Sequence, residues 1–264
     1  MKLGFIGTGN MASAIMGGII KNQIIPANEI IGADVMEAGR KRVKEQFGIQ
    51  ATADNHEVVR NSDVVILSVK PQFYAEVIAE IKDDVREDQI IITIAPGKTL
   101  AWLKEQFGKN VKIVRTMPNT PALVGEGMTA ACPNEYMTKE EITYVLTLLE
   151  SFGRVEIIPE RLMDTVVSVS GSSPAYVFMF IEAMADAAVS GGMPRAQAYQ
   201  FAAQAVLGSA KMVLETGKHP GELKDMVCSP AGTTIEAVRV LEEKGFRSAV
   251  IEAMKTCEEI SKNM

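Results

Sequence analysis

A glycine-rich turn near the start of the chain has the residue types and spacing that bind phosphate groups. Gly7, Gly9 and Ala12 form the pattern G-x-G-x-x-A directly after the apolar run Lys2 to Ile6. Between a strand and a helix, the first glycine permits a tight turn, the second lets the backbone approach a pyrophosphate, and the small third residue permits close packing. Free amides at the helix N-terminus then receive the phosphates. The pattern therefore predicts a dinucleotide-binding turn rather than a glycine turn without a ligand.

The charges that follow bear on which dinucleotide binds. Asp34 ends a second apolar run, and a carboxylate about 20 residues beyond such a turn accepts hydrogen bonds from the adenosine ribose of NADH. Arg40, Lys41 and Arg42 follow it and could turn toward the 2′-phosphate of NADPH, although such a run more often forms a solvated helix face. NADH is slightly favoured, and the choice between the two cofactors stays open.

A second anion-binding pattern lies far along the chain. Gly232, Thr233 and Thr234 end a small loop ahead of an apolar segment, and this arrangement offers free amides, a favourable helix dipole and two hydroxyls to an anion. A helix cap without any ligand would have a similar sequence. The pattern alone indicates a candidate site for an anionic substrate and does not identify that substrate.

Other familiar catalytic patterns are missing from the sequence. The two histidines, His56 and His219, have no evident dyad partner, and no paired metal-ligand spacing occurs. Glu182 and Asp186 lie one helical turn apart, but such carboxylates more often meet water or a partner's base than act in catalysis. We predict that no metal is bound.

The first half of the chain alternates short β-branched runs with amphipathic segments, a form typical of a parallel sheet flanked by helices. The runs are almost wholly apolar because strands of such a sheet are buried on both faces. The predicted strands are Lys2 to Ile6, Glu29 to Ala33, Val64 to Ser68, Ile90 to Ile94 and Val111 to Arg115. We therefore expect an α/β fold with an N-terminal Rossmann domain, a doubly wound parallel sheet, over residues 1–158.

The second half, residues 159–264, is expected to be an all-helical domain that binds substrate and forms dimers. Ser173 as N-cap and Pro174 as first helical residue open a helix to about Ser190, and a second helix runs from Arg195 to Glu215. Both helices carry more apolar surface than about 100 residues can bury. A homodimer built from them is the expected assembly.

Composition narrows the function further. Charged residues make up 23% of the chain and the formal net charge is −6, which gives no general attraction for nucleic acid or anionic membranes. The three cysteines are widely spaced, which indicates a reducing cytoplasm. The apolar stretch from Ala175 to Val189 contains two carboxylates and falls short of a membrane span of about 20 residues.

Three further segments, together with the glycine turn, make the whole chain resemble the pyrroline-5-carboxylate reductase family. They are S-V-K-P-Q at residues 68–72, M-P-N-T-P at 117–121, and H-P-G-E-L-K-D at 219–225 leading into S-P-A-G-T-T at 229–234. The resemblance implies a loop that shapes the nicotinamide pocket at 117–121. It also implies a substrate-binding loop at 229–234. Separately, it implies that Asn55 contacts the adenosine of the cofactor.

The resemblance assigns roles to individual residues. Substrate binding falls to Gly232, Thr233 and Thr234, and Thr234 is the candidate catalytic residue, because its hydroxyl would hydrogen-bond the substrate nitrogen. The implied cofactor contacts are Ile6, Gly7, Thr8, Gly9, Asn10, Met11, Asp34, Asn55, Val69, Lys70, Pro71, Ala95, Pro96 and Gly97. The sequence departs from common family residues at four places. It has Asp34-Val35 where many relatives have Asn-Arg, Pro96 where Ala is common, Ser173 in place of the second Gly of Gly-Ser-Gly-Pro-Ala-Tyr, and Ala231 in place of the first Gly of Ser-Pro-Gly-Gly.

The implied reaction is the reduction of L-1-pyrroline-5-carboxylate to L-proline by NADH or NADPH, the last step of proline biosynthesis. Relatives of this family build dimers and also larger rings. Two alternatives stay open: a β-hydroxyacid-type dehydrogenase, which needs a lysine that 171–192 lacks, and a non-catalytic NAD(P)-sensing module.

Overall fold

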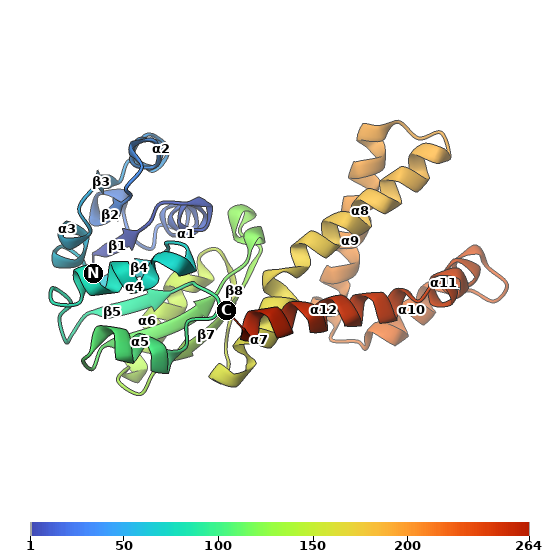
Figure 1. Cartoon of the computed structure of the whole chain (residues 1–264). Coiled ribbons are helices and arrows are strands. Elements are labelled where there is room, and N and C mark those ends of the chain that lie inside the picture. The colour runs from blue at the N-terminus through green and yellow to red at the C-terminus, as the bar shows by residue number, and fades with distance from the viewer. Residues whose placement is uncertain (1, 264) are drawn as a thin grey trace. The chain divides into compact units, whose positions relative to one another are not determined.

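The computed structural model describes residues 2–263, and a single sheet dominates its first part (Figure 1). The strand order is β3-β2-β1-β4-β5-β6-β7-β8, and every neighbouring pair is parallel except β6 and β7. The first six strands have the order of a dinucleotide-binding Rossmann sheet, whose ligand binds beyond the carboxyl ends of the strands. The predicted doubly wound sheet is confirmed.

The strands are β1 (Leu3–Ile6), β2 (Ile30–Ala33), β3 (Gln50–Thr52), β4 (Val64–Leu67), β5 (Ile90–Thr93), β6 (Lys112–Met117), β7 (Gly127–Pro133) and β8 (Gly153–Ile157). The five predicted strands are confirmed to within two residues at each end. The sequence did not predict three strands, the edge strands β3 and β8 and the inner strand β7, because they lack a continuous apolar run.

The helices that accompany the sheet are α1 (Asn10–Lys21), α2 (Glu37–Phe47), α3 (Asn55–Arg60), α4 (Tyr74–Ile81), α5 (Leu100–Phe107), α6 (Lys139–Glu150) and α7 (Met163–Val166). They form two layers, because successive strand residues point to opposite faces. One core joins Phe5 and Ile66 to side chains of α1, α2 and α6. The other joins Ile6 and Leu67 to side chains of α3, α4 and α5.

The helical second part contains α8 (Ser173–Ser190), α9 (Arg195–Thr216), α10 (Pro220–Val227), α11 (Thr233–Glu243) and α12 (Phe246–Lys262). The long helices α8 and α9 agree with the predicted segments. The prediction of Ser173 as an N-cap was wrong, because the chain is already helical through α7 and the π-helical turn Val167–Gly171. Pro174 is tolerated because that upstream turn is irregular.

The chain divides into two compact units, residues 1–172 with 257–264 and residues 173–256. The end of α12 belongs to the first unit, where Ser261 donates a hydrogen bond to Asp164 Oδ1 at 2.8 Å and Cys257 Sγ lies 3.3 Å from Ser172 Oγ. The functional division at residues 158 and 159 stays a prediction.

Helices of the second unit expose large apolar side chains. Phe178 is 63% exposed, Met179 68% and Phe201 68%. One helical stretch, Glu160–Ser190, is long and apolar enough to cross a membrane by length and composition alone, and only 11% of its apolar window is buried. An apolar surface of this extent indicates contact with another protein or a lipid phase.

Candidate active site

The glycine turn after β1 is held by backbone contacts that no other residue type would allow. Gly7 has φ +91° and its amide donates to Ala33 O at 2.8 Å. A Cβ atom at Gly7 would lie 2.8 Å from Ser68 O and 2.9 Å from Val69 N. Both the left-handed backbone and the close approach of the neighbouring turn therefore require glycine.

Gly9 has the opposite surroundings. It is the N-cap of α1, in an extended conformation, and no side chain caps the helix. A Cβ atom at this position would meet no protein atom within 4 Å. The first amides of α1, from Asn10 and Met11, thus begin at an open space, while Ala12 packs into the core at 1% exposure. The geometry fits a pyrophosphate at the helix N-terminus.

Ile6 and Thr8 lie beneath this turn, at 1% and 0% exposure. Thr8 donates to Asp34 Oδ2 from its amide at 2.9 Å and from its hydroxyl at 2.7 Å. Its carbonyl accepts a hydrogen bond from the Arg42 guanidinium. The polar groups of Thr8 therefore support the turn, and a direct contact of either residue with a cofactor stays a prediction.

Asp34 stands at the carboxyl end of β2, as the sequence predicts. Its second carboxylate oxygen, Oδ1, accepts the amide of Met36 at 2.9 Å. Burial opposes ionisation, but the hydrogen bonds from Thr8 and Met36 and the charge of Arg42 outweigh it, so the pKa of Asp34 is lowered. The ionised carboxylate retains capacity to accept further hydrogen bonds, such as those from ribose hydroxyls.

The three basic residues of α2 do not act alike. Arg40 donates to Asp34 O at 2.7 Å and to Val35 O at 3.1 Å, and Arg42 donates to Thr8 O. Lys41 extends to Glu45, 3.9 Å away. Two of the three therefore touch the backbone around the turn, whereas a solvated face was the more common expectation for all of them.

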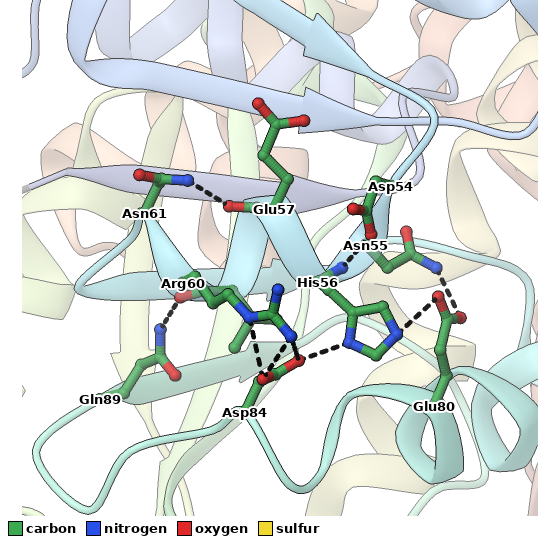
Figure 2. Close-up of polar contacts among 10 residues, drawn as sticks. Asp54, Asn55, His56, Glu57, Arg60, Asn61, Glu80, Asp84 and Gln89 are labelled. Carbon is green, nitrogen blue, oxygen red and sulfur yellow. Dashed lines mark hydrogen bonds and ion pairs between the residues drawn. The ribbon is translucent and has the colours of Figure 1, made fainter.

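Asn55 begins α3, just beyond the carboxyl end of β3, and Figure 2 shows its amide turned toward Glu80 of α4. Asn55 Nδ2 donates to Glu80 Oε2 at 2.9 Å. This bond uses one of the two Nδ2 hydrogens, so the second hydrogen and the Asn55 carbonyl oxygen remain for a ligand.

His56 has a partner that the sequence analysis missed. Its Nδ1 bonds to Asp84, which also receives Arg60 Nε at 3.0 Å, and its Nε2 lies 3.8 Å from Glu80 (Figure 2). The hydrogen bond from His56 to the Asp84 carboxylate raises the pKa of His56 more than desolvation lowers it. The expectation of no histidine dyad was wrong, because residues 28 positions apart in sequence are brought together only by the packing of α3 on α4. The cluster lies at the surface and is partly buried, with the His56 and Asp84 side chains 36% and 19% exposed.

The turn after β4 is tied to the glycine turn. Ser68 Oγ donates to Gly7 O at 2.7 Å, and Ser68 N donates to Ile6 O at 2.8 Å. Val69 is half-buried, Lys70 is exposed, and Pro71 opens a short 3-10 helix, Pro71–Phe73, that leads into α4. The second cofactor turn thus lies directly beside the first.

The next turn, after β5, contains Ala95, Pro96 and Gly97. Ala95 is 2% exposed and Gly97 has φ +73°. Tyr74, which the sequence analysis did not single out, joins this turn to the previous one, because its buried hydroxyl donates to Leu67 O at 2.5 Å and accepts from Ile94 N at 3.3 Å. No sequence pattern marks a tyrosine for such a role.

The loop after β6 is held by a buried amide. Asn119, 8% exposed, accepts from Met128 N at 2.8 Å and donates to Ser170 O at 3.0 Å. Met117 beside it is 5% exposed. Asn119 therefore fixes the 117–121 loop against β7 and the π-helical turn, and a role in the nicotinamide pocket stays a prediction.

The predicted substrate loop belongs to the second unit. Gly232 is the N-cap of α11, extended, without a side-chain cap, and its amide donates to Ser229 O at 3.0 Å. Thr233 is exposed and Thr234 half-buried. Ala231 has φ +55°, a left-handed conformation unusual for a residue with a side chain.

Among residues 2–263, no group of three or more His, Cys, Asp or Glu side chains could hold a metal ion. The prediction that the protein binds no metal remains a prediction.

Known proteins resemble the chain over its full length. Residues 160–264 match the family model described as pyrroline-5-carboxylate reductase dimerisation, and residues 2–97 match NADP oxidoreductase, coenzyme F420-dependent. The pyrroline-5-carboxylate reductase of Escherichia coli K12 is 55% identical over 100% of this chain and 98% of its own.

Solved structures agree with this similarity. A pyrroline-5-carboxylate reductase from Coxiella burnetii has a TM-score of 0.91 at 35% identity, covering 99% of this chain and 97% of its own. The Plasmodium falciparum pyrroline carboxylate reductase, solved with NADP bound, has a TM-score of 0.91 at 33% identity, covering 100% of this chain and 97% of its own.

Proposed function

Because the chain belongs to the pyrroline-5-carboxylate reductase family, we propose that two helix N-termini divide the reaction: α1 holds the cofactor and α11 holds the substrate. The chain is an NAD(P)H-dependent oxidoreductase that reduces L-1-pyrroline-5-carboxylate to L-proline, the last step of proline biosynthesis.

The open space at Gly9 is the observation that carries the cofactor assignment. A pyrophosphate there would meet the amides of Asn10 and Met11, and the turns at Val69–Pro71 and Ala95–Gly97 would flank the rest of the dinucleotide. The adenosine end would reach Asp34 and the Asn55 carbonyl oxygen. When bound, the reduced nicotinamide supplies the hydride.

The substrate carboxylate would bind at the N-terminus of α11. Gly232 would let the substrate approach the backbone because it has no side chain, and the first-turn amides, which no side chain caps, would receive the carboxylate. The exposed Thr233 hydroxyl adds a donor. Thr234 would hydrogen-bond the ring nitrogen and so orient the imine carbon.

The reaction needs no proton from a side chain at the hydride-transfer step. A protonated imine is already electrophilic, so hydride addition at its carbon gives the neutral secondary amine without a further proton. The protein acts by holding the two reacting carbons in register, and effective molarities for well-oriented reactants reach about 10⁵ M or more.

NADH and NADPH are both compatible with the turn, and we propose a slight preference for NADH. Asp34 is ionised and would repel a 2′-phosphate at the ribose. The guanidinium groups of Arg40 and Arg42 are engaged with backbone carbonyl oxygens, so neither is fully available for a phosphate.

We propose that the protein forms a homodimer in the cytoplasm and that this dimer can serve as the unit of a larger ring. The exposed apolar side chains of α8 and α9 support a protein partner, since the same residues fall in the part that matches a dimerisation family. A membrane partner would leave the carboxylates Glu182 and Asp186 in hydrocarbon. Light scattering that shows a stable folded monomer at micromolar concentration would contradict the dimer.

The test of function follows loss of absorbance of the reduced nicotinamide with pyrroline-5-carboxylate as substrate. Wild-type protein with NADH and with NADPH gives the activity and the preference, and the ratio of kcat/KM values measures the preference directly. Turnover with both, faster with NADH, is expected. Cofactor binding without turnover would instead support a non-catalytic sensing module.

A further inference from the structure

Tyr74 has a hydroxyl with two backbone partners at the carboxyl edge of the sheet. It is the first residue of α4 and is 0% exposed. Its hydroxyl donates to Leu67 O, the last residue of β4, at 2.5 Å, and accepts from Ile94 N, just beyond β5, at 3.3 Å. One buried hydroxyl thus joins the carboxyl ends of the two neighbouring strands β4 and β5.

These contacts close the turn between β4 and α4. The segment 68–73 leaves the sheet after Leu67 and enters α4 at Tyr74, whose side chain then returns to Leu67. The same turn is fixed at its start, where Ser68 Oγ donates to Gly7 O at 2.7 Å. The glycine turn, the 68–71 turn and the 95–97 turn are therefore linked in series.

The hydroxyl is not needed merely to fill space. Tyr74 packs in an apolar core with Val77, Ile78 and Leu103, where a phenylalanine ring would be accommodated. A buried hydroxyl without partners would be costly, and here both its donor and its acceptor functions are used. Burial raises the pKa of Tyr74 far above its ordinary value, so the phenol stays protonated and serves as a fixed link.

We propose that Tyr74 is a positioning residue for the cofactor: its hydroxyl sets the spacing between the 68–71 and 95–97 turns. The inference rests on the proposed function, in which these turns flank the bound dinucleotide. Tyr74 is 0% exposed, so its side chain is not accessible to a bound substrate. It acts through backbone atoms on either side of the cofactor.

The substitution Tyr74→Phe removes only the hydroxyl. We expect KM for the preferred cofactor to rise about tenfold, as for the loss of one well-placed hydrogen bond, with kcat and KM for pyrroline-5-carboxylate within about twofold. A direct titration of cofactor binding by its fluorescence should show the same increase in Kd. Unchanged cofactor KM and Kd in folded Tyr74→Phe would overturn the inference.

A general loss of stability must be separated from this effect. Val145→Ala empties a site that is 1% exposed in the other core, under α6, and should lower Tm at least as much as Tyr74→Phe while leaving cofactor KM unchanged. An equal rise of cofactor KM in Val145→Ala would refute a specific role for Tyr74.

If Tyr74→Phe does not fold, p-fluorophenylalanine can be placed at position 74, because it retains the volume but cannot donate to Leu67 O. The same rise of cofactor KM is then expected, and an unchanged KM overturns the inference. Wild-type protein without turnover on pyrroline-5-carboxylate would remove the proposed function itself. Turnover with an unaltered cofactor KM in the variants would remove only the role of Tyr74.

Discussion

The N-termini of α1 and α11 have the same local geometry in different surroundings. Both begin at a glycine in extended conformation, Gly9 with φ −67° and ψ −169° and Gly232 with φ −81° and ψ 168°, and neither has a side-chain cap. Both leave first-turn amides for an anion. The similarity is local, because a short sequence can specify it.

The two differ in what supports them. The turn at Gly9 rests on a buried sheet and is fixed by Thr8, Asp34 and Ser68, whereas the loop before Gly232 is largely exposed and contains a strained alanine. Space at the glycines differs as well: a Cβ at Gly9 meets nothing, but one at Gly232 would lie 2.3 Å from Ser229 Oγ. The turn at Gly9 is therefore held in its binding conformation by the surrounding sheet. The conformation at Gly232 depends on contacts within its own loop.

The largest effect is expected from Gly9→Ala. The added methyl group clashes with no protein atom, so Tm should change by less than about 2 °C, but it occupies the space for the pyrophosphate. We expect kcat/KM for the cofactor to fall about 100-fold, the size of effect that a displacement of about 1 Å produces. Steady-state kinetics and calorimetry test this. Full activity in the variant would show that the cofactor does not approach Gly9.

The matching change at the second N-terminus is Thr234→Ala. Loss of a hydrogen bond to a charged substrate should lower kcat/KM for pyrroline-5-carboxylate roughly 10- to 100-fold, with cofactor Kd unchanged. Thr256→Ala on α12, where an exposed threonine bonds its own helix, is the control. If both variants lose activity equally, Thr234 has no special part and the two N-termini do not divide the reaction as proposed.

Backbone strain gives opposite predictions for the two sites. Ala231→Gly relieves the left-handed conformation at φ +55° and should stabilise the protein by about 0.5 kcal/mol after the added chain entropy of glycine. Gly7→Ala imposes the reverse at φ +91° with backbone 2.8 Å away, and should cost about 3 kcal/mol. Chemical denaturation measures both. A loss of stability in Ala231→Gly would indicate that the alanine side chain makes a contact worth more than the strain.

The smallest effect concerns the charged cluster beside Asn55. The pKa of His56 is raised by its hydrogen bond to the Asp84 carboxylate, so His56 in the folded protein should titrate above 6.5 by NMR, and Asp84→Asn should lower its pKa again. Because the folded pKa is the higher one, the contribution of this pair is complete below pH 6.5 and is lost as the pH rises through the folded value. A midpoint below 6.5 would contradict the pairing.

Much of the first unit could be predicted from sequence because its signals are local. Apolar runs marked the buried strands β1, β2, β4, β5 and β6, and the glycine turn followed the first of them. The edge strands β3 and β8 lack that signal, since an edge strand is only partly buried. The N-cap at Ser173 was mispredicted because a π-helical turn continues the helix through a serine that resembles a start signal.

By itself the sequence determined the family, the doubly wound α/β class of the first half, and glycine at the positions where backbone must turn or a ligand must approach. Each of these depends on residues that are neighbours in the chain. Only the tertiary structure decided that Asp84 partners His56, that Glu80 orients Asn55, and that the Tyr74 hydroxyl joins two turns. These contacts link residues on different elements, and their geometry exists only once the helices pack on the sheet.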